Sequence, residues 1–196
     1  MAVEYTKTIS EVIEQLEVGN PLPNLVPENA WNDELTNSLA DLSLEDLFQG
    51  QTVKDDTYAK AIKSGLFLWN DALDESHEIS QTLANDTGSY WHGLMHRREP
   101  DYSNSKYWFG RVGDHPIFPS LRDSVLTLSN EIQNPSDTLS QIIMTIESQD
   151  NWDSFQFVDL CETAEKDPTS DTTEFLRQVQ AEEIKLLLGY SYQNAI

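Results

Sequence analysis

Residues 88–116 read GSYWHGLMHRREPDYSNSKYWFGRVGDHP and decide how the fold of this chain is interpreted. The segment holds three of the four histidines of the 196-residue chain and two of its five tryptophans. Pro100 ends a helix-forming run that begins near Ser89, and Gly113 follows a second run that begins at Asp101 or Ser103. The segment therefore predicts a helix, a turn and a second helix that carry polar and aromatic side chains.

The residues before this segment predict a long helix. From about residue 56 to residue 83, apolar residues recur with the 3.6-residue helical period, at Ile62, Leu66, Trp69 and Leu73. The run Asn85-Asp86-Thr87-Gly88 then stops the helix and turns the chain. We expect two antiparallel helices joined by this turn.

The rest of the chain also favours helices, and few segments alternate as strands do. Three prolines between residues 21 and 27 interrupt the chain after a short amphipathic helix. Residues 134–150 fit a strand or a helical turn equally well. We predict an all-α, helical bundle-like domain over residues 28–196 that carries the central motif at 65–118, preceded by an N-terminal helical arm and Pro-rich linker over residues 1–27.

Charge is distributed unevenly along this acidic protein. The net charge of −22 divides into −9 over residues 1–60 (3 basic, 12 acidic), −2 over 61–122 (6 basic, 8 acidic) and −11 over 123–196 (3 basic, 14 acidic). Acidic surfaces repel nucleic acid and anionic lipid, which argues against both as partners. With one cysteine, no signal-peptide pattern and no apolar run of about 20 residues, the sequence predicts a cytoplasmic protein with no membrane role.

Three histidines have the spacing of metal ligands. Asp74 and His77 are three residues apart, and His92 and His96 are four apart, so each pair shares one side of its helix. Antiparallel packing of the two helices would bring His77 level with His96 and let all three imidazoles converge. Imidazole and carboxylate ligands suit zinc or iron, with Asp74 or Glu99 as the carboxylate. The alternative is a set of core histidines that are hydrogen-bonded to carboxylates.

Basic and aromatic side chains surround these histidines. Guanidinium and ammonium groups bind carboxylate or phosphate, and aromatic rings line ligand pockets. The ligand-binding candidates are Tyr90, Trp91, Arg97, Arg98, Lys106, Trp108, Arg111 and His115. The alternatives are buried ion pairs for the basic residues and core packing for the rings.

The same residues define the candidate functions. A metal-dependent hydrolase or oxygenase would use the histidines for the ion, Glu75 or Glu99 for proton transfer, and an arginine to orient a small polar or anionic substrate. A non-catalytic ligand-binding protein needs the same lining without a metal. A protein-interaction factor would instead use the acidic flanks, as a nucleic-acid mimic does, to hold a basic protein partner.

The blocks SYWHG, MHRREPD and KYWF, with DESHEISQ before them, resemble a family of uncharacterised bacterial and fungal proteins. The resemblance covers about residues 61–192. It implies no activity, substrate or cofactor, and it places the histidines and arginines within the family's signature. Gly110 departs from the pattern, which implies a larger and basic residue at that position.

Overall fold

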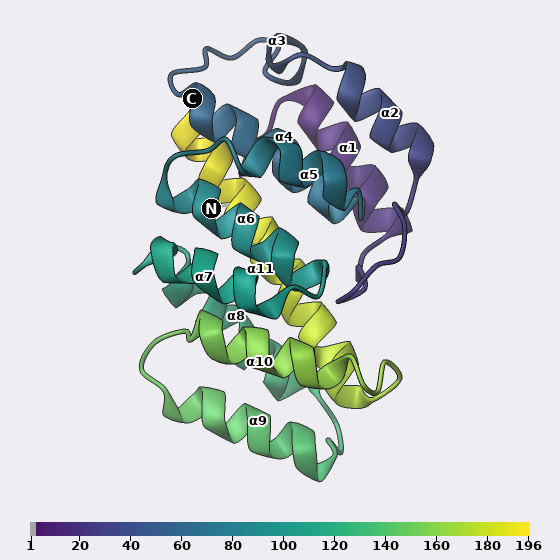
Figure 1. Cartoon of the computed structure of the whole chain (residues 1–196), viewed down its shortest axis with the longest axis vertical. Coiled ribbons are helices and arrows are strands. Elements are labelled where there is room, and N and C mark those ends of the chain that lie inside the picture. The colour runs from purple at the N-terminus through teal and green to yellow at the C-terminus, as the bar shows by residue number, and fades with distance from the viewer. Residues whose placement is uncertain (1–2) are drawn as a thin grey trace.

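A computed structural model describes residues 3–196, and these residues form helices and connecting segments without a strand (Figure 1). The predicted all-α, bundle-like fold is confirmed. In chain order the helices are α1 (Lys7–Gly19), α2 (Asp33–Asp41), α3 (Leu44–Leu47), α4 (Asp56–Trp69), α5 (Leu73–Ser80), α6 (Asp86–Arg98), α7 (Tyr102–Val112), α8 (Phe118–Glu131), α9 (Asp137–Ser148), α10 (Ser154–Ala164) and α11 (Asp171–Ala195).

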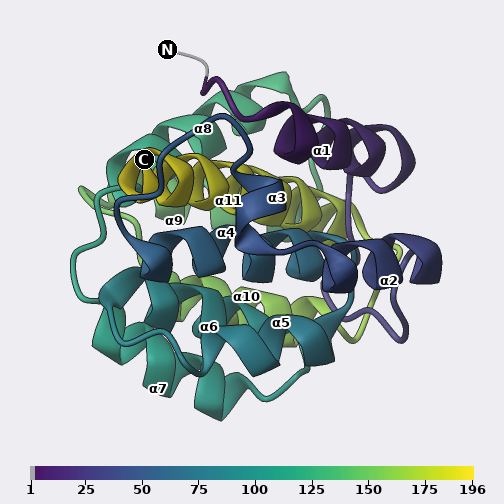
Figure 2. The same ribbon diagram turned by 90° about the horizontal axis from the view of Figure 1, so that it is seen from above.

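The C-terminal helix α11 is the axis of the molecule. It has 25 residues and runs through the middle of the structure, with α4 packed near its C-terminal end, α8 beside it, and α9 and α10 nearer its N-terminal end (Figures 1 and 2). Buried side chains lie all around it, because other helices cover most of its circumference. No helix among the described residues has both the length and the apolar character that crossing a bilayer requires.

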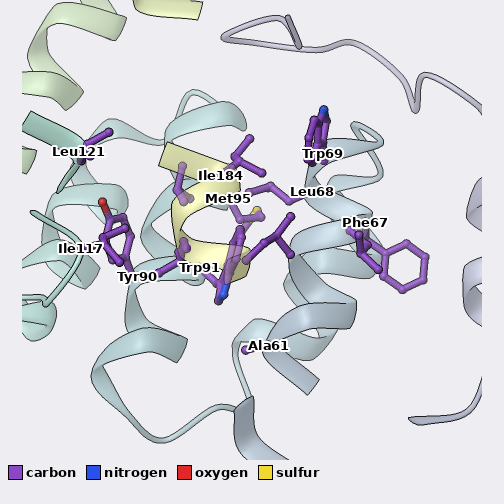
Figure 3. Close-up of a cluster of buried hydrophobic side chains, with 14 of the residues drawn as sticks. Ala61, Phe67, Leu68, Trp69, Tyr90, Trp91, Met95, Ile117, Leu121 and Ile184 are labelled. Atoms are coloured by element: carbon purple, nitrogen blue, oxygen red, sulfur yellow. The ribbon is translucent and has the colours of Figure 1, made fainter. Parts of the chain in front are cut away.

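The core is densest where α4, α6 and α11 meet. Trp91 on α6 lies between the other two helices (Figure 3), and its indole N–H donates to Ser191 Oγ at 3.2 Å. A Cβ at Gly65 of α4 would lie 2.6 Å from the Trp91 ring and 2.8 Å from Leu188. Glycine at position 65 therefore allows α4 to approach α6 closely.

The single long helix expected over residues 56–83 is divided in the structure, and that expectation was wrong. α4 ends at Trp69 and α5 begins at Leu73, with Asp71 between them at φ 61°. The reason is tertiary: the Asn70 amide donates to Asn32 O (2.9 Å), and Asp71 forms an ion pair with Arg98. These contacts hold the backbone out of the helical conformation despite the apolar period.

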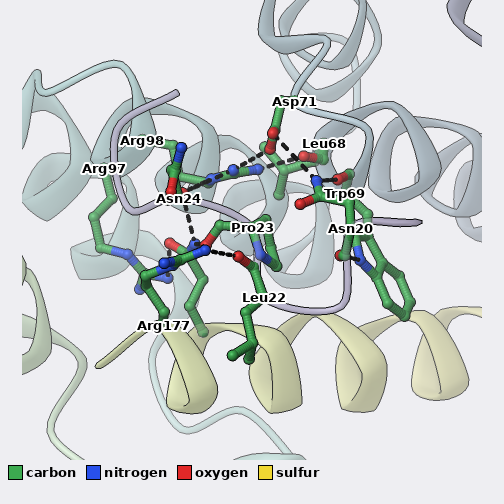
Figure 4. A network of polar contacts seen from close by, with 11 residues as sticks. Asn20, Leu22, Pro23, Asn24, Leu68, Trp69, Asp71, Arg97, Arg98 and Arg177 are labelled. Atoms are coloured by element: carbon green, nitrogen blue, oxygen red, sulfur yellow. Dashed lines mark hydrogen bonds and ion pairs between the residues drawn. The ribbon is translucent and has the colours of Figure 1, made fainter. Parts of the chain in front are cut away.

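The N-terminal arm packs on the rest of the molecule. α1 buries Ile9, Val12 and Leu16, and the Thr6 hydroxyl just before it donates to Leu47 O at 2.5 Å. The Pro-rich segment crosses α11 as a strap (Figure 4). Its carbonyl groups accept hydrogen bonds from three long side chains beneath it: Arg98 to Asn24 O, Arg177 to Leu22 O, and Gln180 to Asn24 O. Extended, Pro-rich backbone leaves carbonyls free for such contacts.

Residues 134–150, which the sequence left open between strand and helix, contain α9. Ser136 caps this helix by accepting from Leu139 N, and Leu139 and Ile146 are its buried residues. The helical alternative is therefore correct, with α9 packed against α8 and α11.

Candidate metal centre

The turn between α5 and α6 sets the register of the histidines. Asn85 caps α6 by accepting a hydrogen bond from Gly88 N at 2.7 Å. A Cβ at Gly88 would lie 2.3 Å from Leu83 Cβ and 2.7 Å from Leu83 O, so only glycine fits this close approach. The turn returns the chain along α5 and brings the central turns of α6 opposite His77.

His77, His92 and His96 converge as the sequence predicts. Their ligand nitrogens all lie within 4.8 Å of one another. The ring centroids are 4.9 Å apart for His77 and His92, 5.2 Å for His77 and His96, and 4.7 Å for His92 and His96. Among the described residues this is the one group of three or more potential ligands that is close enough to hold an ion. Asp74 is exposed and lies outside the group.

His92 is the most deeply buried of the three, with 4% of its surface exposed. Neither of its ring nitrogens has a hydrogen-bond partner within residues 3–196. Its ring stacks on Trp108 with the centroids 4.0 Å apart. Burial, with smaller contributions from the neighbouring His96 and His77, lowers the pKa of His92 to about 3. The imidazole is therefore neutral at pH 7 and keeps the lone pair that a metal ligand needs.

His96 is held by a carboxylate and an amide. Its Nδ1 lies 3.0 Å from Glu99 Oε2, and its Nε2 lies 3.0 Å from the Asn104 side-chain nitrogen. A proton on Nδ1 donated to Glu99 leaves the lone pair on Nε2, which is the arrangement of many metal-bound histidines. Burial lowers the pKa of His96, although Glu99 opposes this shift.

Asn104 is not among the site residues predicted from the sequence. It lies in the first turn of α7, where its backbone N–H donates to Asp101, the residue that caps the helix. The reversal of chain direction between α6 and α7 carries its side chain back to His96. The sequence shows only that Asn104 follows the capping residue Asp101 by three positions, and this spacing does not indicate where the Asn104 side chain points.

The three imidazoles are slightly too far apart for direct coordination. Zinc–nitrogen bonds of 2.0–2.1 Å in a tetrahedral site require nitrogens about 3.4 Å apart. The separations here extend to 4.8 Å, so binding would require small side-chain rotations toward a common centre. Three imidazole ligands leave a fourth position open, as catalytic zinc sites do.

The predicted acidic residues lie on the outer side of this cluster. Asp74, Glu75 and Glu99 line a pocket of about 350 Å³ together with Asp71 and Glu28. Glu99 therefore borders both the acidic pocket and His96, whereas no contact joins Glu75 to a histidine. The geometry makes Glu99 a residue that positions His96.

Two of the predicted ligand-binding residues lie together beside the cluster. Trp108 and Arg111 line a hollow of about 550 Å³, with Gln81, Asn85 and Ser89 among its polar residues. The Arg111 guanidinium lies 5.5 Å from the centroid of the Trp108 ring, which in turn stacks on His92. Arg111 is exposed and forms no ion pair with the described residues.

Arg97 and Arg98 point away from the histidines. Arg97 pairs with Glu183 of α11 (Nη2 to Oε2, 2.5 Å), and Arg98 pairs with Asp71. Arg98 also donates to Leu68 O and Asn24 O, as Figure 4 shows. These contacts match the structural alternative, in which the arginines form buried ion pairs.

Four further candidates also have structural partners. Tyr90 donates to Glu183 Oε1 at 2.8 Å, and Trp91 is part of the core. Lys106 forms an ion pair with Asp159. His115 is buried, with Nε2 3.1 Å from Thr87 Oγ1 and Nδ1 accepting from Ile117 N at 3.4 Å. None of the four lines the hollow beside Trp108 and Arg111.

Fold and site together define an all-α protein with a buried three-histidine cluster that lies between an acidic pocket and a hollow carrying a free arginine. The chain matches no protein-family model, no curated protein and no solved structure. The resemblance carried by its SYWHG and MHRREPD blocks stays a prediction.

Proposed function

We propose that the chain binds a divalent transition metal, zinc or iron(II), through His77, His92 and His96, and uses it as a metal-dependent hydrolase or oxygenase. The observation that supports this most is His92. A buried imidazole with two unpartnered nitrogens costs the fold about 1–3 kcal/mol for each unmade hydrogen bond. A metal ion would accept the single available lone pair of the neutral imidazole and offset the part of that cost that belongs to this nitrogen.

The surrounding residues fit the same role. Glu99, at 3.0 Å from Nδ1 of His96, would fix the tautomer that directs Nε2 to the ion. Asn104 would then turn its amide toward the open coordination position and hydrogen-bond a water molecule there. A divalent ion lowers the pKa of such a water toward 7 and supplies a nucleophile or an oxygen-binding position.

The proposed substrate is a small polar or anionic molecule that enters the hollow beside the cluster. Arg111 offers an exposed guanidinium that forms no ion pair with the described residues, and Asp86 is the one carboxylate that also lines the hollow. Trp108 offers a flat ring next to His92. Together they would hold an anionic group and a planar or apolar portion of a substrate close to the metal.

Metal analysis of untagged protein tests the proposal. Protein supplemented with Zn²⁺, or with Fe²⁺ under anaerobic conditions, and then dialysed should retain about one equivalent of metal. The variant His77→Gln should retain less than a tenth of that, since it removes one ligand at a half-buried position. His115→Gln is the matched control, because it alters a buried histidine outside the cluster.

Less than about 0.1 equivalent of metal in the supplemented protein would refute the metal centre. So would full binding by a His77→Gln, His92→Phe double variant. Hydrolysis of 4-nitrophenyl acetate and 4-nitrophenyl phosphate, and oxygen uptake by the iron-loaded protein, then separate catalysis from simple metal binding. Either activity should be lost in His77→Gln.

A further inference from the structure

A second hollow lies between the C-terminal end of α7 and the segment that leads into α10, and none of the four histidines lines it. It has a volume of about 580 Å³. Its lining combines carboxylates with aromatic rings: Asp114, Asp150 and Asp153 with Trp152 and Phe155, next to Gly110. No lysine, arginine or histidine lines it.

The carboxylates of this hollow are not used by the fold as ion-pair partners. Asp153 caps α10 by accepting from Gln156 N, but Asp114 and Asp150 form no ion pair with the described residues. The Arg122 guanidinium lies next to the hollow, where it donates to Gln149 O, but it forms no ion pair with the described residues, so the three carboxylates disfavour an anionic ligand. The three also do not converge as metal ligands do, because the histidine cluster is the one such group in residues 3–196.

The aromatic rings are the second element of the hollow. Phe155 is 43% exposed, so part of its ring faces solvent at the hollow. Trp152 is only 7% exposed, yet its indole N–H has no hydrogen-bond partner within the described residues. The first turn of α10 thus carries a partly exposed ring at Phe155, and Trp152 just before the helix carries a donor without a partner among the described residues.

Gly110 borders this hollow at a position from which a longer side chain would enter it. A Cβ there would meet only Phe155 Cζ at 3.7 Å, an ordinary contact, and its φ is not positive. Glycine inside a helix costs about 1 kcal/mol relative to alanine. Neither packing nor backbone conformation requires glycine at this exposed position of α7, and its effect is to leave the space beside Phe155 empty.

We propose that this hollow binds a small organic cation, namely an ammonium group that carries methyl or other apolar substituents. Asp114 and Asp150 attract the charge, and the exposed face of Phe155 contacts the apolar substituents and adds a cation–π interaction. A hydroxyl or carbonyl oxygen on the ligand would accept from the unpartnered Trp152 N–H after a small movement of the ring. This site is independent of the proposed metal centre.

Calorimetric titration with choline chloride at low ionic strength tests the proposal. The full-length protein should bind choline saturably, and metal removal with EDTA should leave the affinity unchanged. The neutral isostere 3,3-dimethylbutan-1-ol should bind at least tenfold more weakly, because it has the same shape without the charge. Equal affinity for the two compounds, or no saturable binding of choline, would overturn the proposal.

Variants locate the binding to this hollow. Gly110→Lys should weaken choline binding at least tenfold, since it places a tethered ammonium among the aspartates, whereas Gly110→Ala should bind as the native protein does. Phe155→Ala and Asp150→Asn should each weaken binding about two- to fivefold. Asp33→Asn, the same charge change on α2 at the other end of the molecule, should have no effect. Native affinity in a Gly110→Lys variant with an unchanged circular dichroism spectrum would place the binding elsewhere and refute the proposal.

Discussion

The two sides of α6 carry polar side chains that are equally buried and very differently paired. On one side Arg98 has each guanidinium nitrogen bonded, to Asp71 and to the carbonyls of Leu68 and Asn24. On the other side His92 has no partner for either ring nitrogen among the described residues. The contacts of Arg98 fix the Pro-rich strap and the break between α4 and α5. On the histidine side, His96 is hydrogen-bonded to Glu99 and Asn104, whereas the His92 ring stacks on Trp108 and forms no hydrogen bond with the described residues. The proposed metal site rests on this difference.

Breaking an ion pair on the arginine side should give the largest effect. Glu183→Gln removes the charge opposite Arg97 while both side chains are fully buried. An uncompensated guanidinium in the core should lower the free energy of unfolding by about 3–5 kcal/mol, measured by urea denaturation. The double variant Arg97→Met, Glu183→Leu should recover most of this loss. A loss below about 0.5 kcal/mol in Glu183→Gln would mean that Arg97 does not depend on the pair, and would return it to the ligand-binding candidates.

His115 provides an intermediate case, a buried imidazole with partners at both nitrogens. Burial lowers its pKa to about 4 even though Asp86 raises it, whereas an unfolded histidine titrates near 6.5. Between these values the unfolded chain binds a proton that the folded chain does not, so stability is present above pH 6.5 and is lost as the pH falls toward 4.

The contribution of His115 to that loss should reach up to about 1.4 kcal/mol per pH unit. Denaturation in EDTA at pH 7, 6, 5 and 4.5 measures it. The variant His115→Phe, which cannot titrate, should show a shallower decline than the native protein. Parallel curves for the two proteins would show that His115 has the same pKa in the folded and unfolded states.

Exchanging His92 for an apolar ring should have a smaller effect and the opposite sign. In the presence of EDTA, His92→Phe removes two unpartnered nitrogens and keeps the stacking on Trp108, so stability should stay constant or rise by about 1 kcal/mol. The same exchange at His115 removes the partners of Thr87 and Ile117 and should lower stability by about 1–3 kcal/mol. A destabilised His92→Phe would mean that this histidine has a structural role.

The histidine cluster could be predicted from the sequence because it depends on local rules. Helical spacing places His92 and His96 on one side, and a glycine turn of fixed length returns the chain to His77. The prediction of one long helix was wrong at Asn70 and Asp71 because the helix break depends on contacts that are not local. Their partners, Asn32 and Arg98, are distant in the sequence, and no periodicity encodes them.

The sequence also does not indicate which way the side chains of Arg97 and Arg98 point. Every residue of α6 from Thr87 to Arg98 is buried, so the helix has no apolar stripe to show which side faces the core. A pair of adjacent arginines after a histidine reads equally well as a ligand site and as a structural pair. The partners decide between these interpretations: Glu183 on α11, 86 residues from Arg97, and Asp71, 27 residues from Arg98.

The smallest effect is expected at Lys106, where a predicted ligand-binding cation has become half of an exposed ion pair with Asp159. Lys106→Met should change the free energy of unfolding by less than about 1 kcal/mol, because solvent screens a pair whose side chains are 33% and 57% exposed. In 1 M NaCl the screening length falls to about 3 Å, and the difference from the native protein should vanish. The deficit of Glu183→Gln should persist in the same salt, since that pair is closed to solvent. If the loss of stability in Lys106→Met persists in 1 M NaCl, the aliphatic part of the lysine side chain contributes packing. An unchanged metal content in this variant would show that Lys106 does not contribute to the histidine cluster.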